Sequence, residues 1–290
     1  MTDQAKGLLI TATGVLMIVP DSLFIRLISL DTFGVIFWRS LLTGLVVLAG
    51  IIAIHRRRTW DMFRAMGRAG LIYAFLMAVS VLCFVSSIRL TSVANTVFIL
   101  AAMPVFAALF SRVWLGEAIS RRIALTMVAV IAGIAMIAFG SAGGGDTSLI
   151  GDLLALVIAM SFGLAITVAR RAKGVSMVPA VPIAFLACAA LVFPFTDPLA
   201  VSGLDPIYIA LHGGVFIPAS MTLLAIGPRY ITSAEVALMI LLESVLAPLL
   251  VWAVLGEVPG NWALVGGAVV LGALFLSNLL ALRQARRAVP

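Results

Sequence analysis

The sequence is poor in charged residues. Only 11% of its 290 residues are Asp, Glu, Lys or Arg, whereas 63% are hydrophobic, and the mean hydropathy is +1.22. Soluble globular proteins carry about 25% charged residues, so this composition excludes a soluble globular domain. The apolar segments run to about 20 residues each, the length of a helix that crosses a bilayer core. Alternating strands of the barrel type are absent. We therefore expect an all-α integral membrane protein.

The sequence also lacks the motifs of common catalytic and cofactor sites. It contains no HExxH, GxSxG or CxxC motif and no phosphate-binding glycine loop, and its two histidines are far apart. The two cysteines lie inside apolar segments, where they are expected to be small core residues and not a disulfide. We therefore expect no catalytic residue, no metal, no cofactor and no ATP hydrolysis by this chain.

Basic residues give a formal net charge of +7, but their positions argue against nucleic-acid binding. Of the 19 basic residues 17 are Arg, and most lie in short loops between apolar segments. Cytoplasmic loops of membrane proteins are enriched in Lys and Arg, so these residues report topology. Ten spans are expected, at about residues 7–29, 33–54, 69–88, 92–114, 120–140, 150–170, 178–196, 205–226, 230–255 and 261–282.

The distribution of basic residues over these spans predicts the orientation. If the N-terminus is cytoplasmic, nearly all basic residues fall on the cytoplasmic side, and only Arg26 and Arg89 lie near outer span ends. Both termini are therefore expected in the cytoplasm, in a multi-pass protein of the cell inner membrane.

Two stretches of the chain resemble each other at a separation of 140 positions. Residues 91–117 and 231–257 share seven identities in 27 ungapped positions, including a Leu-Gly-Glu triplet at 115–117 and 255–257. Five spans precede the loop at 141–148 and five follow it. Because five is odd, a duplicated unit must insert upside down relative to its copy, as in many secondary transporters. The expected units are residues 1–140 and 150–290.

The residues that carry the duplication also carry a family resemblance. The run PVFAAL at 104–109 closing on Leu-Gly-Glu, its counterpart ESVLAPL at 243–249, Trp38-Arg39 and GDLLA at 151–155 resemble the EamA family of the drug/metabolite transporter superfamily. The resemblance covers essentially the whole chain and implies ten helices around a central cavity between two repeats, usually for export of small metabolites. The resemblance indicates the architecture and does not specify the substrate.

Glu243 is the deepest carboxyl group, near the middle of the ninth span. A charge at the bilayer centre costs about 2.5–3.5 kcal/mol on insertion scales, so the group needs a partner or a cavity. Two interpretations remain open. In the functional one, Glu243 exchanges a proton or binds a cationic group of the substrate. In the structural one, it is a protonated side chain that forms a hydrogen bond to a neighbouring helix. Met103 stands at the equivalent position of the first unit, so this role is not duplicated.

Asp21 and Arg39 enter the membrane from the same side. Asp21 follows Pro20, and proline breaks or kinks a helix because it lacks a backbone donor. Broken helices of this kind line transport sites. Two interpretations remain open: a cavity-lining role, with Arg39 binding a substrate carboxylate, or a structural ion pair between Asp21 and Arg39.

Further candidates lie on the fourth and ninth spans. Glu235 lies eight residues before Glu243 and on a similar helix face, so one wall could present both carboxylates to a substrate path; Asn95 occupies the corresponding region of the fourth span. The alternative for Glu235 is compensation of the helix dipole. The hinge candidates are Pro20, Pro104 and Pro248, with static kinks as the alternative. Structural roles are favoured for three other polar residues: His212, Glu117 and Glu257.

These observations predict a secondary transporter that exports a small, amino acid-like metabolite by alternating access, with or without proton coupling. Its expected partners are the small-molecule substrate and the lipid bilayer, with no nucleic acid, and the protein is expected to be a monomer or homodimer. One alternative is a membrane-embedded enzyme or lipid-handling protein, but it would need a cluster of catalytic groups that this sequence lacks. The other alternative is a passive channel.

Overall fold

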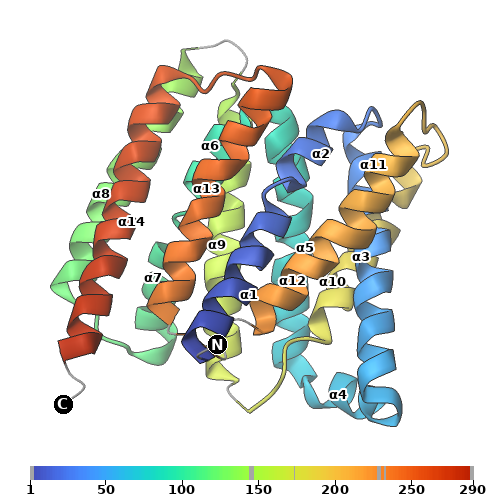
Figure 1. Ribbon diagram of the computed structural model, residues 1–290, viewed down its shortest axis with the longest axis horizontal. Helices are drawn as coiled ribbons and strands as arrows, with labels where there is room; N and C mark the ends of the chain where they lie inside the picture. Colours follow the sequence, from blue (N-terminus) through green and yellow to red (C-terminus); the bar gives the residue numbers. More distant parts are fainter. Residues whose placement is uncertain (1–2, 144–146, 173, 227–229, 232, 288–290) are drawn as a thin grey trace.

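The computed structural model describes residues 3–143, 147–172, 174–226, 230–231 and 233–287, and all regular structure within them is helical (Figure 1). The first half contains α1 (Asp3–Ile18), α2 (Asp21–Leu27), α3 (Thr32–His55), η1 (Arg56–Arg58), α4 (Thr59–Ala65), α5 (Gly67–Leu90), α6 (Val93–Leu100), α7 (Met103–Leu115) and α8 (Arg121–Ala142). The second half contains α9 (Leu149–Arg171), α10 (Ala180–Val192), η2 (Phe193–Phe195), α11 (Asp205–Leu211), η3 (His212–Phe216), α12 (Ile217–Ile226), α13 (Ser233–Leu255) and α14 (Asn261–Arg287).

The helices have the lengths and apolar surfaces of membrane spans. Nine stretches of the described chain are long and apolar enough to cross a bilayer, and the shorter apolar stretch Ala180–Phe195 stands where the seventh span was expected. Large apolar side chains cover the outside; Leu125 and Phe139 on α8 are 72% and 65% exposed. Exposed apolar area on this scale suits contact with lipid and not with water. The sequence prediction of an all-helical multi-pass membrane protein is thus confirmed.

Three expected spans are interrupted, each next to a proline. Pro20 separates α1 from α2, and Pro104 lies one residue after the start of α7, so neither can donate the N–H that would bond to the carbonyl four residues earlier. In the third case Pro218 follows the π-helix η3, where the N–H of Ile217 bonds to the carbonyl oxygen of His212, five residues earlier. Pro248 differs, because α13 continues through it.

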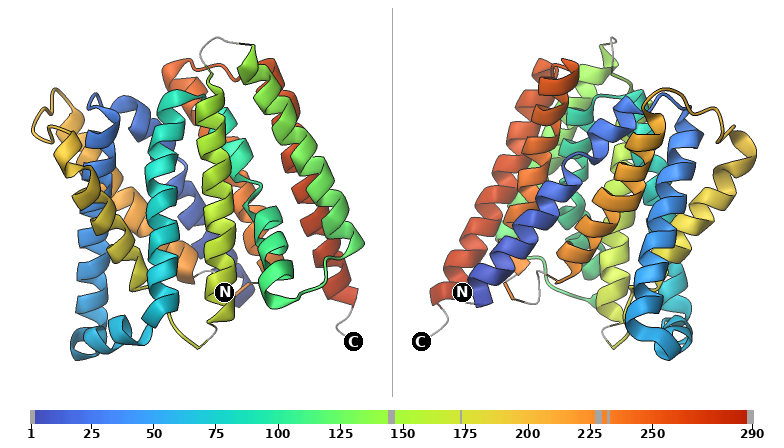
Figure 2. Two further views of the ribbon diagram at one scale, coloured as in Figure 1. Left: turned by 180° about the vertical axis from the view of Figure 1, so that it is seen from behind. Right: turned by 45° about the vertical axis from the view of Figure 1, so that its right-hand side comes forward.

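The two halves of the chain interlock. The first span of each half packs on the third span of the other: α1 lies along α12, and α9 lies along α5. Two further large contacts join equivalent spans of the two halves: α3 packs on α10 at one edge of the bundle, and α8 packs on α14 at the opposite edge (Figures 1 and 2). This exchange of partners is what two five-helix repeats of opposite orientation produce.

The bundle has two ends. We call the end at which α1 begins and α14 ends the terminal face, and the end that holds the α2–α3, α5–α6 and α13–α14 connections the far face (Figure 1). At the edge formed by α8 and α14 the backbones approach closely. A methyl group at Gly133 would lie 2.7 Å from the carbonyl oxygen of Gly266, so these glycines allow the contact.

Candidate functional site

A cavity of about 290 Å³ lies in the middle of the bundle, and both halves of the chain line it. Its wall is mostly apolar and includes three aromatic rings, those of Phe84, Phe162 and Phe185. The ionisable side chains in the wall are Asp21, Arg39 and Glu243, and Ser80, Ser244 and Asn278 add neutral polar groups. An apolar cavity with a few converging polar groups is the usual form of a small-molecule site.

Asp21 is the centre of a buried polar cluster beside this cavity. Its carboxylate accepts two hydrogen bonds from Arg39, from Nε to Oδ1 at 3.2 Å and from Nη2 to Oδ2 at 2.8 Å. The Nε2 atom of His212 lies 2.5 Å from the same Oδ1. All three side chains are buried, at 4%, 6% and 1% exposure for Asp21, Arg39 and His212. The ion pair considered from the sequence is therefore present, and both of its members also line the cavity.

Arg39 is held in a fixed orientation. The rings of Phe84 and Phe185 flank its guanidinium group, with centroids 5.6 and 5.7 Å from Cζ. Such rings stabilise a cation through their quadrupoles. The third nitrogen, Nη1, is buried and has no hydrogen-bond partner among the described residues. A buried donor without a partner is costly, so an acceptor supplied by a ligand would relieve it.

The π-helix η3 places His212 against this cluster. The carbonyl oxygen of Gly213 accepts a hydrogen bond from the Thr43 hydroxyl group at 3.1 Å. A methyl group at Gly213 would lie 3.0 Å from the Cβ of Leu42, so the turn approaches α3 closely. Single π-turns inside helices are frequent at functional sites. Sequence reasoning interpreted His212 as a packing residue, and only this tertiary contact reveals its partner.

Glu243 stands on α13 in the wall of the same cavity. Within the described part of the chain its carboxyl group forms no hydrogen bond and no ion pair, and the side chain is partly exposed to the cavity space. The structure thus brings Asp21, Arg39 and Glu243 to one cavity, together with Pro104 of the hinge candidates. Pro20 adjoins it as the residue before Asp21.

Asn95 and Glu235 lie away from this cavity. The Glu235 carboxylate accepts a hydrogen bond of 2.8 Å from Gln4 near the terminal face. The Asn95 amide donates to Asp152 at 3.0 Å and to Ser141 at 2.9 Å, and Thr91 donates to the same Asp152 oxygen at 2.8 Å. Sequence reasoning did not select Asp152, which appeared only within the GDLLA run.

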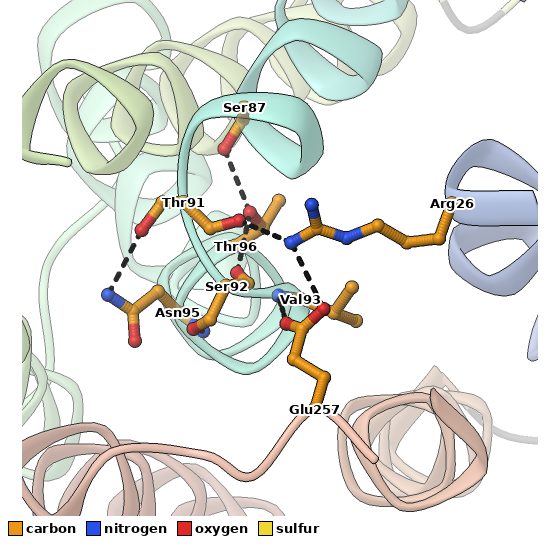
Figure 3. Close-up of polar contacts among 8 residues, drawn as sticks. All are labelled: Arg26, Ser87, Thr91, Ser92, Val93, Asn95, Thr96 and Glu257. Atoms are coloured by element: carbon orange, nitrogen blue, oxygen red, sulfur yellow. Dashed lines mark hydrogen bonds and ion pairs between the residues drawn. The ribbon is translucent and has the colours of Figure 1, made fainter. Parts of the chain in front are cut away.

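A second hollow of about 660 Å³ opens at the far face, and an ion pair lies in its wall. The Nη2 atom of Arg26, at the end of α2, lies 3.1 Å from the carboxylate of Glu257 in the α13–α14 connection (Figure 3). The same nitrogen donates to the carbonyl oxygen of Thr91 at 2.8 Å, and the N–H of Val93 donates to Glu257 at 2.7 Å. Glu257 therefore bonds to the first turn of α6.

The terminal face carries a similar ion pair. Arg170, at the end of α9, donates to Glu117 in the α7–α8 connection at 2.7 Å and to the Ser111 hydroxyl group at 3.2 Å. Glu117 and Arg170 are 44% and 46% exposed as side chains, whereas Arg26 and Glu257 are only 24% and 25% exposed.

Known proteins resemble this chain at the level of family and fold. The model of the EamA-like transporter family matches residues 5–139 and again residues 149–279. No curated protein matches the chain. A solved structure described only as "Crystal structure of protein" has a TM-score of 0.63 and 19% identity, over 95% of this chain and 99% of that one, which supports the fold alone. Because the family match covers both halves, the chain is a member of the EamA-like transporter family.

Proposed function

We propose that the protein is a secondary transporter that exports a small amino acid-like metabolite across the inner membrane by alternating access. The observation that carries the substrate proposal is the pairing of opposite charges in one apolar cavity. Arg39 has a donor without a partner, and Glu243 has a carboxyl group without a partner within the described chain. A molecule with a carboxylate and an ammonium group would satisfy both groups at once.

The proposed orientation rests on the loops. The basic residues Arg56, Arg57, Arg58, Arg121 and Arg122 all lie at the terminal face. The positive-inside rule then places this face in the cytoplasm. Export is the usual direction for the family that the sequence resembles.

Proton coupling is proposed for Glu243. A carboxyl group in the membrane interior must be neutral or paired, because an isolated charge there is costly. Binding of the ammonium group of a substrate would pair the ionised form, and release of the substrate would favour uptake of a proton. One group could thus couple proton movement to substrate movement in opposite directions.

The test is flux into proteoliposomes with labelled amino acids, carboxylates without an amine, and amines without a carboxylate. We expect saturable flux and counterflow for amino acids. We expect weaker transport of the carboxylates that lack an amine and of the amines that lack a carboxylate. Glu243→Gln is expected to abolish flux driven by a pH gradient while leaving the Tm of the protein within about 2 °C of the parent. Asp61→Asn, a change to an exposed acid on α4, is the matched control.

Three outcomes would contradict the proposal. Flux that rises linearly with concentration, without counterflow, would indicate a channel. Equal transport of amines and amino acids would remove the carboxylate from recognition by Arg39. Unchanged pH-driven flux in Glu243→Gln would remove Glu243 from the coupling.

A further inference from the structure

The ion pair between Arg26 and Glu257 joins the two repeats at the far face. Arg26 belongs to the first repeat and Glu257 to the second, and their bonds to Thr91 and Val93 tie both residues to the α5–α6 connection (Figure 3). Three segments far apart in the sequence therefore meet at one point. Alternating access moves one repeat against the other, so bonds that join them at one face must break when that face opens.

This ion pair lines the far-face hollow, and elements that line the hollow continue to the central cavity. The same elements line both spaces: α2 contributes Arg26 to the hollow and Asp21 to the cavity, and α6 contributes Asn95 to the hollow and Val97 to the cavity. Arg26 follows Asp21 by five residues, which is about 7–8 Å along a helix. The layer that separates the two spaces is thus thin at this point.

The inverted repeat supplies an independent argument. The family model matches two stretches, residues 5–139 and 149–279. Arg26 and Arg170 each lie 21 residues after the start of their stretch. Glu117 and Glu257 each lie 22 residues before the end of theirs. The two ion pairs are therefore equivalent positions of the two repeats, exchanged between them and located at opposite faces. A local surface contact would not be expected to recur in this exchanged form.

We propose that Arg26 and Glu257 form the latch that closes the far side of the transport path. This inference rests on the transport function proposed above. The equivalent pair at the terminal face is about twice as exposed and bonds to no backbone carbonyl or N–H through its side chains within the described residues, so it is the weaker of the two. The latch residues are positioning residues, because neither lines the central cavity.

The test is the reactivity of a cysteine in the central cavity toward a membrane-impermeant maleimide added at the far face. In a background with Cys83 and Cys188 replaced, Met103→Cys supplies the reporter, since Met103 lines the cavity. A separate Leu199→Cys variant, at an 81% exposed position beyond α10, is labelled by the impermeant maleimide only from the far face. Its labelling therefore shows whether intact cells or inverted vesicles expose the far face to the reagent. No substrate is needed for this measurement.

Glu257→Gln keeps an acceptor for Val93 but removes the charge, and we expect far-face labelling of the reporter to become about three- to tenfold faster. Arg26→Gln provides a second variant with the same expected direction, in case the first folds poorly. Glu117→Gln, in the equivalent pair, is the matched control and should leave far-face labelling unchanged.

Unchanged labelling in folded Glu257→Gln and Arg26→Gln would overturn the latch, as would an equal rise in Glu117→Gln. The outcome is separable from the transport proposal. Faster labelling with no flux of any metabolite would leave the latch standing and reject the transporter, whereas measured transport with unchanged labelling would reject the latch alone.

Discussion

Removing the charge of Asp21 should destabilise the protein strongly. In Asp21→Asn the guanidinium group of Arg39 stays buried at 6% exposure, next to a side chain that no longer carries the compensating charge. Breaking a buried ion pair from one side costs about 3–5 kcal/mol. For proteins of 150–250 residues each kcal/mol shifts Tm by about 2–4 °C, so a loss of roughly 6–20 °C is expected.

The double variant distinguishes coupling from simple damage. Arg39→Met removes the charge but keeps a flexible apolar side chain between Phe84 and Phe185. Replacing both members of a buried pair is often close to neutral, so Asp21→Asn with Arg39→Met should recover at least half of the Tm lost in Asp21→Asn. Transport should remain absent, because the double variant lacks Arg39, the proposed hydrogen-bond donor to the substrate carboxylate.

The assay is thermal unfolding in detergent at a fixed heating rate, since unfolding of membrane proteins is commonly irreversible. In a background with Cys83 replaced, Cys188 is a built-in probe, because it is 1% exposed and is expected to react with a fluorogenic maleimide only after unfolding. A loss below about 2 °C in Asp21→Asn, or a double variant whose loss equals the sum of the single losses, would refute the coupling.

Two further predictions concern packing and use the same assay. Gly133→Ala should lower stability by about 1–3 kcal/mol, because its methyl group would lie 2.7 Å from the Gly266 carbonyl oxygen. Gly272→Ala on the same pair of helices meets nothing within 4 Å and should be neutral or slightly stabilising, and equal losses would contradict the close-approach argument. Thr43→Val should cost about 1–3 kcal/mol, because it leaves the carbonyl oxygen of Gly213 in the π-helix without its hydroxyl partner, and an unchanged Tm would show that this bond does not hold η3 in place.

Part of the candidate site was accessible from the sequence. Asp21, Arg39 and Glu243 were selected because ionisable groups are rare in spans, and the structure places all three at one cavity. Glu235 met the same criterion, and Asn95 was selected as its counterpart on the fourth span. Both lie elsewhere, because the rule identifies unusual residues without saying which helix faces meet. The hydrogen-bond partner of His212 could not be identified from the sequence, because that partner, Asp21, is 191 positions away in the chain.

The sequence by itself determined that this protein folds in a lipid bilayer, that it is all-helical, and that it contains a duplicated five-span unit. Apolar segments of membrane length leave the backbone no other way to satisfy its hydrogen bonds, and Pro20 and Pro104 mark helix breaks because each removes one N–H. Tertiary structure alone decided which polar groups share a cavity and that Arg26 meets Glu257 across the repeats. Such contacts depend on the rotation and tilt of packed helices, and spacing along one helix does not specify them.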